Sequence, residues 1–496
     1  MDYRCALEYM IVGLGYIWCS TLSHLRGIPL WGMPASYVLI LLGLYHQQRK
    51  TPAEHRTRPG ADRGLWMITC FPFAIYASGS QVYHGDNFRL VEIVTGHTLC
   101  LSLTTACYAP SSIRVIISAA VTTLLLTAYL TSYSVINSFL ASIVCSTVFC
   151  YLRDKLKIHA ATSFTDGELI ILVQAISVFC TSSSICFLST IQVSKIASFL
   201  QAGLFSLCIL IFILYRISST RSSVVTFIIT VTAVCGFLLY PLLYWSLRGE
   251  PIHFITSFLA ASGRRIALIG FWFGLCVVAV IFAMYSNRFT SKKTSRIAIR
   301  KVFHLFIIAV FTTGACFDPD LTYLASGSML GVMVVVEIIR VLQIDPLGSS
   351  IQKIFDAFLD EKDQGPLVVS HIYLLLGCSL PFLLYPGEDY SRDGVTLTLL
   401  TGVTILGVGD TVAAVFGARY GRTRWPNSKK TLEGTLAAIV AQLAFCMFFA
   451  PVTADIVFFA KLSVILVLSS CLEATTEQND NLAVPLFALP LFIALL

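Results

Sequence analysis

VVTFIITVTAVCGFLLYPLLYW (residues 224–245) carries no charged side chain over its 22 residues. An α-helix of about 20 residues crosses the roughly 30 Å hydrocarbon core of a bilayer. No water is available there, so an apolar segment must satisfy its backbone hydrogen bonds internally, as a helix does. The stretch therefore predicts a membrane-spanning helix.

Similar apolar runs recur along the whole chain. Of its 496 residues, 56% are hydrophobic and 12% are charged, and the mean hydropathy is +0.79. A water-soluble domain of this length does not normally have such a composition. We therefore expect an all-α, polytopic integral membrane protein with about 15 transmembrane helices in a single membrane domain. The other clear runs are residues 31–45, 65–80, 91–109, 113–130, 134–152, 168–188, 196–215, 266–285, 302–317, 321–342, 367–385, 395–418, 432–450, 456–471 and 483–496, with 7–22 a weaker candidate.

The positive charges are grouped between these runs. The net charge is +7, and the basic residues cluster at 49–63, 153–157, 216–221, 288–301 and 419–430. The positive-inside rule assigns such clusters to the cytosol. Because the basic loops are short and separated by spans, we expect a phosphate or membrane-surface partner and no nucleic acid.

Tracing the spans from one basic loop to the next places the polar clusters of the C-terminal half on a single, cytosolic face. The N-terminal half shows no comparable clusters at its membrane boundaries. We therefore expect residues 1–287 to form a transmembrane scaffold region. Residues 288–496 are expected to form a transmembrane catalytic region with a cytosolic nucleotide-binding loop.

One stretch differs from the apolar background: GVGDTVAAVFGARYGRTRWPNSKKTLEGT, residues 407–435. Gly407 and Gly409 permit close backbone approach or unusual dihedral angles immediately before Asp410. A charge near the membrane boundary costs at least about 2.5 kcal/mol unless it is paired. Asp410 therefore needs a cation, and a divalent metal would serve. Pairing with Arg419, or capping of a helix, are the alternatives.

The same stretch continues as a run of cations. Guanidinium groups and lysines are suitable ligands for a triphosphate, although a basic loop that only sets the topology is the simpler interpretation. Two features favour phosphate binding: glycines interleave with the charges, and the final lysines lead into a helix whose positive end attracts anions. The candidate nucleotide-binding residues are Gly407, Gly409, Arg419, Arg422, Lys429, Lys430, Thr431 and Gly434, and Arg424 belongs to the same run of cations.

The remaining polar groups of this face are further candidates. Arg300, Lys301 and His304 open a span, and the spacing of four places Arg300 and His304 on one helical face. Arg300 and Lys301 could equally be anchors at the membrane surface. Glu337 and Arg340 could be a structural ion pair.

The acidic segments leave two interpretations open. Asp360, Glu361 and Asp363 form either a solvated acidic loop or a source of one metal ligand, because Mg²⁺ takes carboxylate and phosphate oxygens together. A second acidic segment between the last two spans supports the same reasoning more weakly, through Glu473, Glu477, Asp480 and Asn481.

Taken together, these segments resemble one known family. The motifs are RKVFH (300–304), EIIR (337–340), DEKDQGPLVVSHIYLLLG (360–377), residues 407–435 and EATTEQNDNLAVPL (473–486). The combination resembles the polyprenol kinase family, most closely its dolichol kinases. Residues 360–376 point to that branch over the phytol kinases and the CTP-dependent diacylglycerol kinases.

The resemblance implies an enzyme of the endoplasmic reticulum membrane with its active site facing the cytosol. Such an enzyme moves the terminal phosphate of CTP to the hydroxyl of dolichol, with Mg²⁺ or another divalent cation, and supplies protein glycosylation pathways. It places Gly409, Asp410, Lys429, Lys430, Glu433 and Gly434 in the nucleotide-binding and catalytic region.

Specific roles follow as hypotheses. Lys429, Lys430 and Arg419 would hold phosphate oxygens, Asp410 would bind the metal, and Glu433 would complete the metal shell or orient a lysine. The candidates for the base that takes the alcohol proton are His304, Asp410 and Asp360. A transporter of a lipid-linked or anionic solute is the competing class, but the sequence shows no internal repeat, which such proteins often have.

Overall fold

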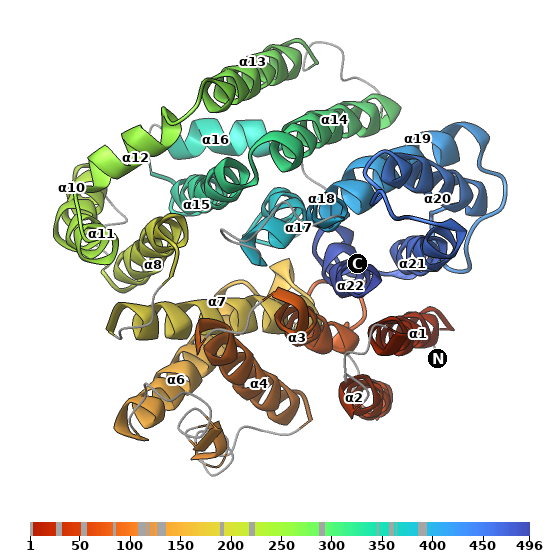
Figure 1. The fold of residues 1–496 in the computed structure, drawn as a ribbon, viewed down its shortest axis with the longest axis horizontal. Helices are drawn as coiled ribbons and strands as arrows, with labels where there is room; N and C mark the ends of the chain where they lie inside the picture. The colour runs from red at the N-terminus through yellow and green to blue at the C-terminus, as the bar shows by residue number, and fades with distance from the viewer. Residues whose placement is uncertain are drawn as a thin grey trace.

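The computed structural model describes residues 3–25, 32–50, 57–82, 86–107, 117, 120–122, 124–125, 135–188, 193–217, 224–286, 293–344, 347–356, 362–363, 365–384 and 394–496. Within these ranges the chain is helical apart from its connections, and Figure 1 shows a bundle without a sheet. The described part of the chain thus confirms the expected all-α class.

Most helices of the N-terminal half cover the predicted apolar runs, although one helix, Pro251–Leu259, matches none of them. They are α1 (Tyr3–Leu25), α2 (Gly32–Lys50), α3 (Cys70–Val82) with the 3₁₀ turn Leu65–Thr69 before it, α4 (Asp86–Cys107), α6 (Val135–His159), α7 (Asp166–Leu188), α8 (Lys195–Arg216), α10 (Val224–Val234), α11 (Tyr240–Leu247), α12 (Pro251–Leu259) and α13 (Gly263–Ser286).

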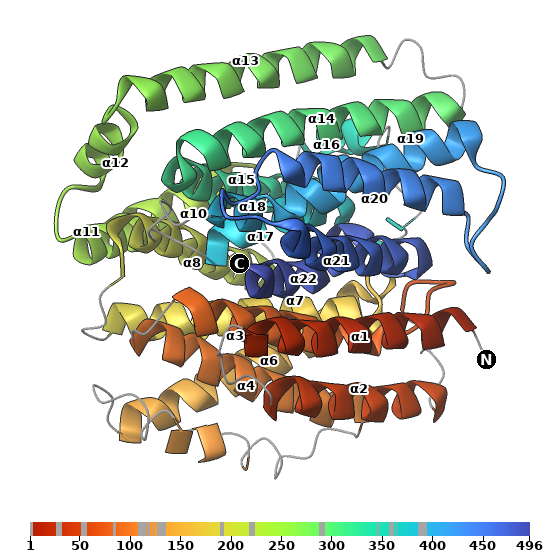
Figure 2. The same ribbon diagram turned by 45° about the vertical axis from the view of Figure 1, so that its right-hand side comes forward.

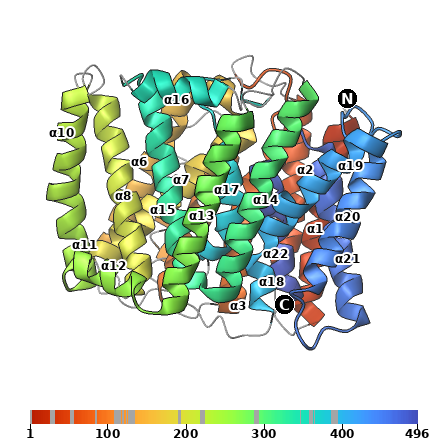
Figure 3. The same ribbon diagram turned by 90° about the horizontal axis from the view of Figure 1, so that it is seen from above.

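The C-terminal half continues in the same way. Its helices are α14 (Lys293–Phe317), α15 (Pro319–Val341), α16 (Leu347–Asp356), α17 (Ser370–Leu384), α18 (Val395–Leu399), α19 (Thr411–Tyr420), α20 (Leu432–Met447), α21 (Ile456–Thr475) and α22 (Asp480–Leu495). Most of them stand roughly parallel to one another in Figure 3, as expected for helices that cross one bilayer.

The structure does not confirm the expected number of about 15 membrane-spanning helices. Eight described helices are long and apolar enough to span a membrane, and five shorter apolar helices accompany them. The weak candidate at residues 7–22 lies inside one of the eight, Tyr3–Ser23. The run at residues 113–130 lies largely outside the described residues.

The two halves of the chain share one core. Helix α22 is buried along nearly its whole length and packs against α1, α3, α17 and α21 (Figures 1 and 2). A single cluster of buried side chains extends from Tyr9 in α1 to Leu495 in α22. Helix α13, by contrast, packs mainly on α14 and exposes large apolar side chains such as Phe273, as a lipid-facing helix does. The two regions that meet at residue 287 therefore belong to one packed body, and they differ only in the role that we expect for each.

Two segments depart from regular α-helix inside predicted spans. Cys235–Leu239 and Val403–Asp410 are π-helical. Such segments are rare and are often found at functional sites. The second one, η4, ends at Asp410, so the backbone irregularity and the carboxylate singled out from the sequence coincide.

Candidate functional site

A cavity of about 580 Å³ opens between α19, α20, α21 and the loop that joins α19 to α20. Small residues of α19 line one wall, namely Ala413, Ala414, Gly417 and Ala418. Because these side chains are small, they leave space between α19 and α20. The charged lining residues are Asp410, Arg422, Arg424, Lys429, Lys430 and Glu473. The volume lies within the range typical of small-molecule sites, roughly 300–1,000 Å³.

Asp410 is paired with two residues of α14. Its Oδ2 accepts from Lys301 Nζ and lies 3.3 Å from His304 Nε2. Lys301 and His304 are three residues apart and so lie on one face of α14. The sequence grouped His304 with Arg300, whereas the structure groups it with Lys301; the side chain of Arg300 lies outside the described part of the structure. Arg419 is not the partner of Asp410 here, because it lies over the Tyr420 ring at 5.5 Å, away from the cavity lining.

The glycines before Asp410 act through close approach. A Cβ at Gly409 would lie 1.9 Å from Gln442 Nε2, and one at Gly407 would lie 2.5 Å from Ile308 Cγ1. Neither glycine has a positive φ. Of the two roles the sequence left open, the structure therefore selects tight packing of η4 against α14 and α20.

The basic loop, residues 421–431, is a tight hairpin. The Ser428 amide donates to Trp425 O (3.1 Å) across a turn with Pro426 at its second position and Asn427 at φ 54° in its third. That is the signature of a type II turn. Further bonds close the hairpin, from Trp425 N to Lys430 O (3.0 Å) and from Leu432 N to Thr423 O (2.8 Å). The cations are consequently carried by an ordered segment.

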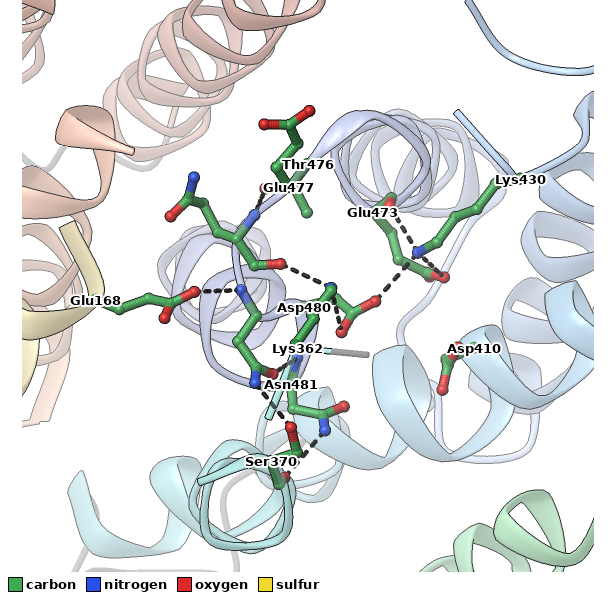
Figure 4. Close-up of polar contacts among 12 residues, drawn as sticks. Glu168, Lys362, Ser370, Asp410, Lys430, Glu473, Thr476, Glu477, Asp480 and Asn481 are labelled. Carbon is green, nitrogen blue, oxygen red and sulfur yellow. Dashed lines mark hydrogen bonds and ion pairs between the residues drawn. The ribbon is translucent and has the colours of Figure 1, made fainter. Parts of the chain in front are cut away.

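Lys430 is held by carboxylates that flank the α21–α22 connection. Its Nζ donates to the Glu473 carbonyl (2.7 Å), the Glu473 carboxylate (3.1 Å) and the Asp480 carboxylate (3.2 Å), as Figure 4 shows. Burial alone would lower the pKa of Lys430, but the Glu473 and Asp480 charges raise it above its ordinary value. Lys430 therefore remains a cation at physiological pH.

The other predicted residues of this stretch shape the loop. Thr431 caps α20 by accepting from Gly434 N (3.2 Å). Glu433 accepts from Thr423 N at 3.0 and 3.2 Å and does not belong to the cavity lining. This geometry favours a loop-shaping role for Glu433 over the predicted metal or lysine-orienting role.

Glu337 and Arg340 form the structural ion pair that the sequence allowed. Both are buried, and Arg340 binds Glu337 through two bonds of 2.6 and 2.8 Å. Each also holds the chain before α17: Arg340 donates to Pro366 O (2.6 Å), and Glu337 accepts from Val368 N (2.7 Å). They fix that segment and do not line the cavity.

We expect Arg340→Met to destabilise the protein. The substitution leaves Glu337 charged and buried without its partner, which typically costs about 3–5 kcal/mol. The apparent melting temperature of the purified protein in detergent should fall by several degrees. Arg248→Met, at the exposed residue that follows α11, is the matched control. An unchanged melting temperature in Arg340→Met would contradict the assignment.

The acidic segment before α17 is only partly described. Asp360 and Glu361 lie outside the described residues. Asp363 is 8% exposed, so it is not a solvated carboxylate; its Oδ1 accepts from the Val369 and Ser370 amides at 3.1 and 3.2 Å. Beside it, Asn481 Nδ2 donates to Ser370 O (3.1 Å). These residues join the start of α17 to the start of α22.

Polar residues of the N-terminal half also reach the end of the bundle that holds the cavity. Arg58 and Glu168 form a buried ion pair with N–O distances of 2.9 and 3.0 Å. Arg4 donates to Asn427 O in the basic loop (2.8 Å). One sequence feature could have indicated these contacts: Glu168 is a carboxylate at the start of an apolar run, where an unpaired charge is costly.

The donor set fits a metal that arrives with a nucleotide. No group of three or more His, Cys, Asp or Glu side chains in the described ranges is placed to hold a metal ion alone. Mg²⁺ usually binds through one or two carboxylates together with substrate phosphates. Asp410 and four cations line the same cavity, so these residues fit a metal that binds together with phosphate groups.

Comparisons with known proteins agree on one family. A family model described as dolichol kinase matches residues 91–448. The chain is 33% identical over 365 residues to the dolichol kinase of Mus musculus, covering 70% of this chain and 68% of the relative. It is 32% identical to that of Homo sapiens, with the same coverage. The dolichol kinase sec59 of Schizosaccharomyces pombe is 26% identical over 452 residues, or 87% of this chain and 84% of the relative. No solved structure matches significantly.

Proposed function

Because this chain belongs to the dolichol kinase family, we propose that it transfers the terminal phosphate of CTP to the hydroxyl of dolichol, giving dolichyl phosphate and CDP. The observation that supports this assignment is the cationic cavity beside Asp410 at the end of a membrane bundle. Dolichol cannot leave the bilayer and a nucleotide cannot enter it. A site at the boundary is where the two can meet.

The cavity offers separate groups for the phosphates and for the reacting centre. Arg422, Arg424 and Lys429 line the cavity and would contact the triphosphate, while Lys430 supplies a charge fixed in place by Glu473 and Asp480. Phosphoryl transfer requires mainly positioning and charge stabilisation from the protein. An ordered hairpin of cations provides both.

The reaction forms one bond and breaks one. The dolichol oxygen attacks the γ-phosphorus, the bond from that phosphorus to the β–γ bridging oxygen breaks, and CDP leaves with the bonding electrons. The hydroxyl proton passes to the Asp410–His304 pair, whose members lie 3.3 Å apart. Lys301, which binds the same carboxylate oxygen, orients Asp410 toward this pair.

We assign a divalent cation, Mg²⁺ by resemblance, to Asp410. Both contacts from α14 fall on Oδ2, so Oδ1 is the oxygen proposed to take the metal. When bound, the cation would neutralise charge on the phosphate oxygens. Asp410 is the single metal ligand that we propose from the protein.

We further propose that the site faces the cytosol from the endoplasmic reticulum membrane. At the end of the bundle that holds the cavity, the described cations include Arg58, Lys362 and those of the basic loop. The positive-inside rule places such an end in the cytosol.

The assignment predicts a phosphorylated lipid in a simple assay. Membranes containing the protein, supplied with [γ-³²P]CTP, Mg²⁺ and a long-chain polyprenol, should transfer the label to an organic-extractable product. Labelled ATP should give much less product. Equal transfer from both nucleotides would overturn the donor assignment, and uptake of a lipid or anion without any labelled lipid would instead favour a transporter.

A further inference from the structure

The connection between α21 and α22, residues 476–479, is buried although it is polar. Thr476, Gln478 and Asn479 are each at most 4% exposed. Two carboxylates that bind Lys430 flank this connection, with Glu473 in the last turn of α21 and Asp480 at the first position of α22. The position of the connection therefore sets the position of both carboxylates.

Several residues from the N-terminal half bind this connection, among them Arg4 at Thr476 O (3.1 Å) and Glu8 at the Glu477 amide (3.2 Å). Two others, Arg58 and Glu168, bind its backbone and also bind each other. Arg58 Nη2 donates to the Glu477 carbonyl (2.9 Å), and Glu168 Oε1 accepts from the Asn479 amide (2.6 Å). Arg58 and Glu168 also bind each other through both oxygens of the carboxylate. Figure 4 shows Glu168 on one side of the connection and Lys430 on the other. We call Arg58 and Glu168 the clamp.

The clamp is almost completely shielded from water. The side chains of Arg58 and Glu168 are 3% and 0% exposed. Bidentate pairs between arginine and a carboxylate are geometrically specific, and their buried charges leave little freedom to rearrange. The atoms that meet the backbone of the connection are thus fixed relative to α7, from which Glu168 projects.

We infer that the clamp positions Lys430 for the nucleotide phosphates, acting through the 476–479 connection, Glu473 and Asp480. Neither clamp residue lines the cavity, so both are positioning residues and not catalytic ones. The inference rests on the proposed function, since it assigns Lys430 a phosphate. It extends the nucleotide site to residues that lie far from it in the sequence.

A competing explanation is that the clamp only stabilises the fold. The two explanations differ in what they change. A purely structural pair would alter the amount of folded protein and leave the nucleotide affinity of the folded molecules unchanged. A positioning pair would weaken nucleotide binding in the folded molecules themselves, because a shift of about 1 Å in a positioned group can cost up to 10²-fold.

The test compares Glu168→Gln with a matched control two residues away. Asp166 lies in the same turn of α7 and forms its own ion pair with Arg63 (2.6 Å) and a longer one with Lys157 (3.8 Å). Neither of those partners belongs to the 476–479 connection. Purified full-length protein is titrated with CTP and Mg²⁺ by calorimetry, with affinities referred to the folded fraction.

Glu168→Gln should raise the Kd for CTP by roughly tenfold, and the KM for CTP in the polyprenol assay should rise in step. Asp166→Asn should stay within about twofold of the parent protein. Arg58→Lys keeps the charge but loses the fork, so it should weaken binding in the same direction. It serves as the decisive variant if Glu168→Gln does not accumulate as folded protein.

Parent-like affinity in folded Glu168→Gln, or in Arg58→Lys, would overturn the inference. So would equal weakening in Asp166→Asn, since that result would indicate a general structural effect. Failure of the parent protein to phosphorylate polyprenol would contradict the proposed function instead. The comparison of dissociation constants would still decide the role of the clamp.

Discussion

Asp410→Asn is expected to lower kcat for polyprenol phosphorylation by on the order of 10³-fold. The amide keeps the shape of the side chain but removes the charge that Lys301 and His304 contact and that we propose binds the metal. Turnover should be measured with labelled CTP at saturating nucleotide and polyprenol. The loss should appear in kcat, because the cations that hold the triphosphate remain in place.

Asp455→Asn is the matched control for this variant. Asp455 caps α21 by accepting from Phe458 N (2.7 Å), and asparagine caps helices equally well. The control should keep parental activity and show that one Asp-to-Asn change does not disturb the bundle. Full turnover in folded Asp410→Asn would remove both the metal assignment and the proton-transfer pair.

Lys430→Gln is expected to raise the KM for CTP by at least about tenfold, or about 1.4 kcal/mol. The change deletes the cation that Glu473 and Asp480 share; Asp480 keeps its ion pair with Lys362 (3.1 Å), whereas Glu473, which lines the cavity, loses its cation. A triphosphate would meet negative charge where it now meets a neutralised cluster. Initial rates at varied CTP give the KM directly.

The pH dependence offers a second measurement on the same residue. The pKa of Lys430 is raised by Glu473 and Asp480 against the effect of burial. A raised pKa means that the stabilising charge is fully present below the ordinary lysine pKa, about 10.4, and is lost only at higher pH. Titration of Lys430 should therefore add no pH dependence to the KM for CTP between about pH 6.5 and 9.

Lys461→Gln is a suitable control, because Lys461 lies on α21 but outside the cavity lining. Its KM for CTP should match that of the parent protein. If Lys430→Gln also gave a parental KM, the cationic hairpin would not be the phosphate site, whatever its effect on kcat.

Many of the cavity-lining residues could be predicted from the sequence, because charged side chains beside a membrane carry a free-energy cost unless they are paired. An aspartate beside the membrane must be neutralised, and a run of cations next to a helix start attracts anions. Asp410, Arg422, Arg424, Lys429 and Lys430 line one cavity in the structure, and their roles there stay predictions. The predicted phosphate ligand Arg419 lies outside that lining.

The roles of several other residues could not be predicted. Glu433 binds a loop amide, Asp363 is buried against the start of α17, and Arg58 reaches Glu477 across 419 positions of sequence. In each case the deciding fact is which backbone group lies within hydrogen-bond reach. Sequence spacing gives that information only within one helix, through its regular period.

Local sequence properties predicted the membrane class and the approximate positions of most helices, but not α12, α16 or the start of α14. Hydrophobicity is a local property that adds up residue by residue, and a bilayer of nearly fixed thickness converts it into spans. Tertiary packing determines which charges neutralise one another, how η4 carries Asp410 to the cavity, and that Arg4 of the N-terminal half contacts the basic loop. Those outcomes depend on helix packing between distant segments, where a difference of one ångström separates a bond from none.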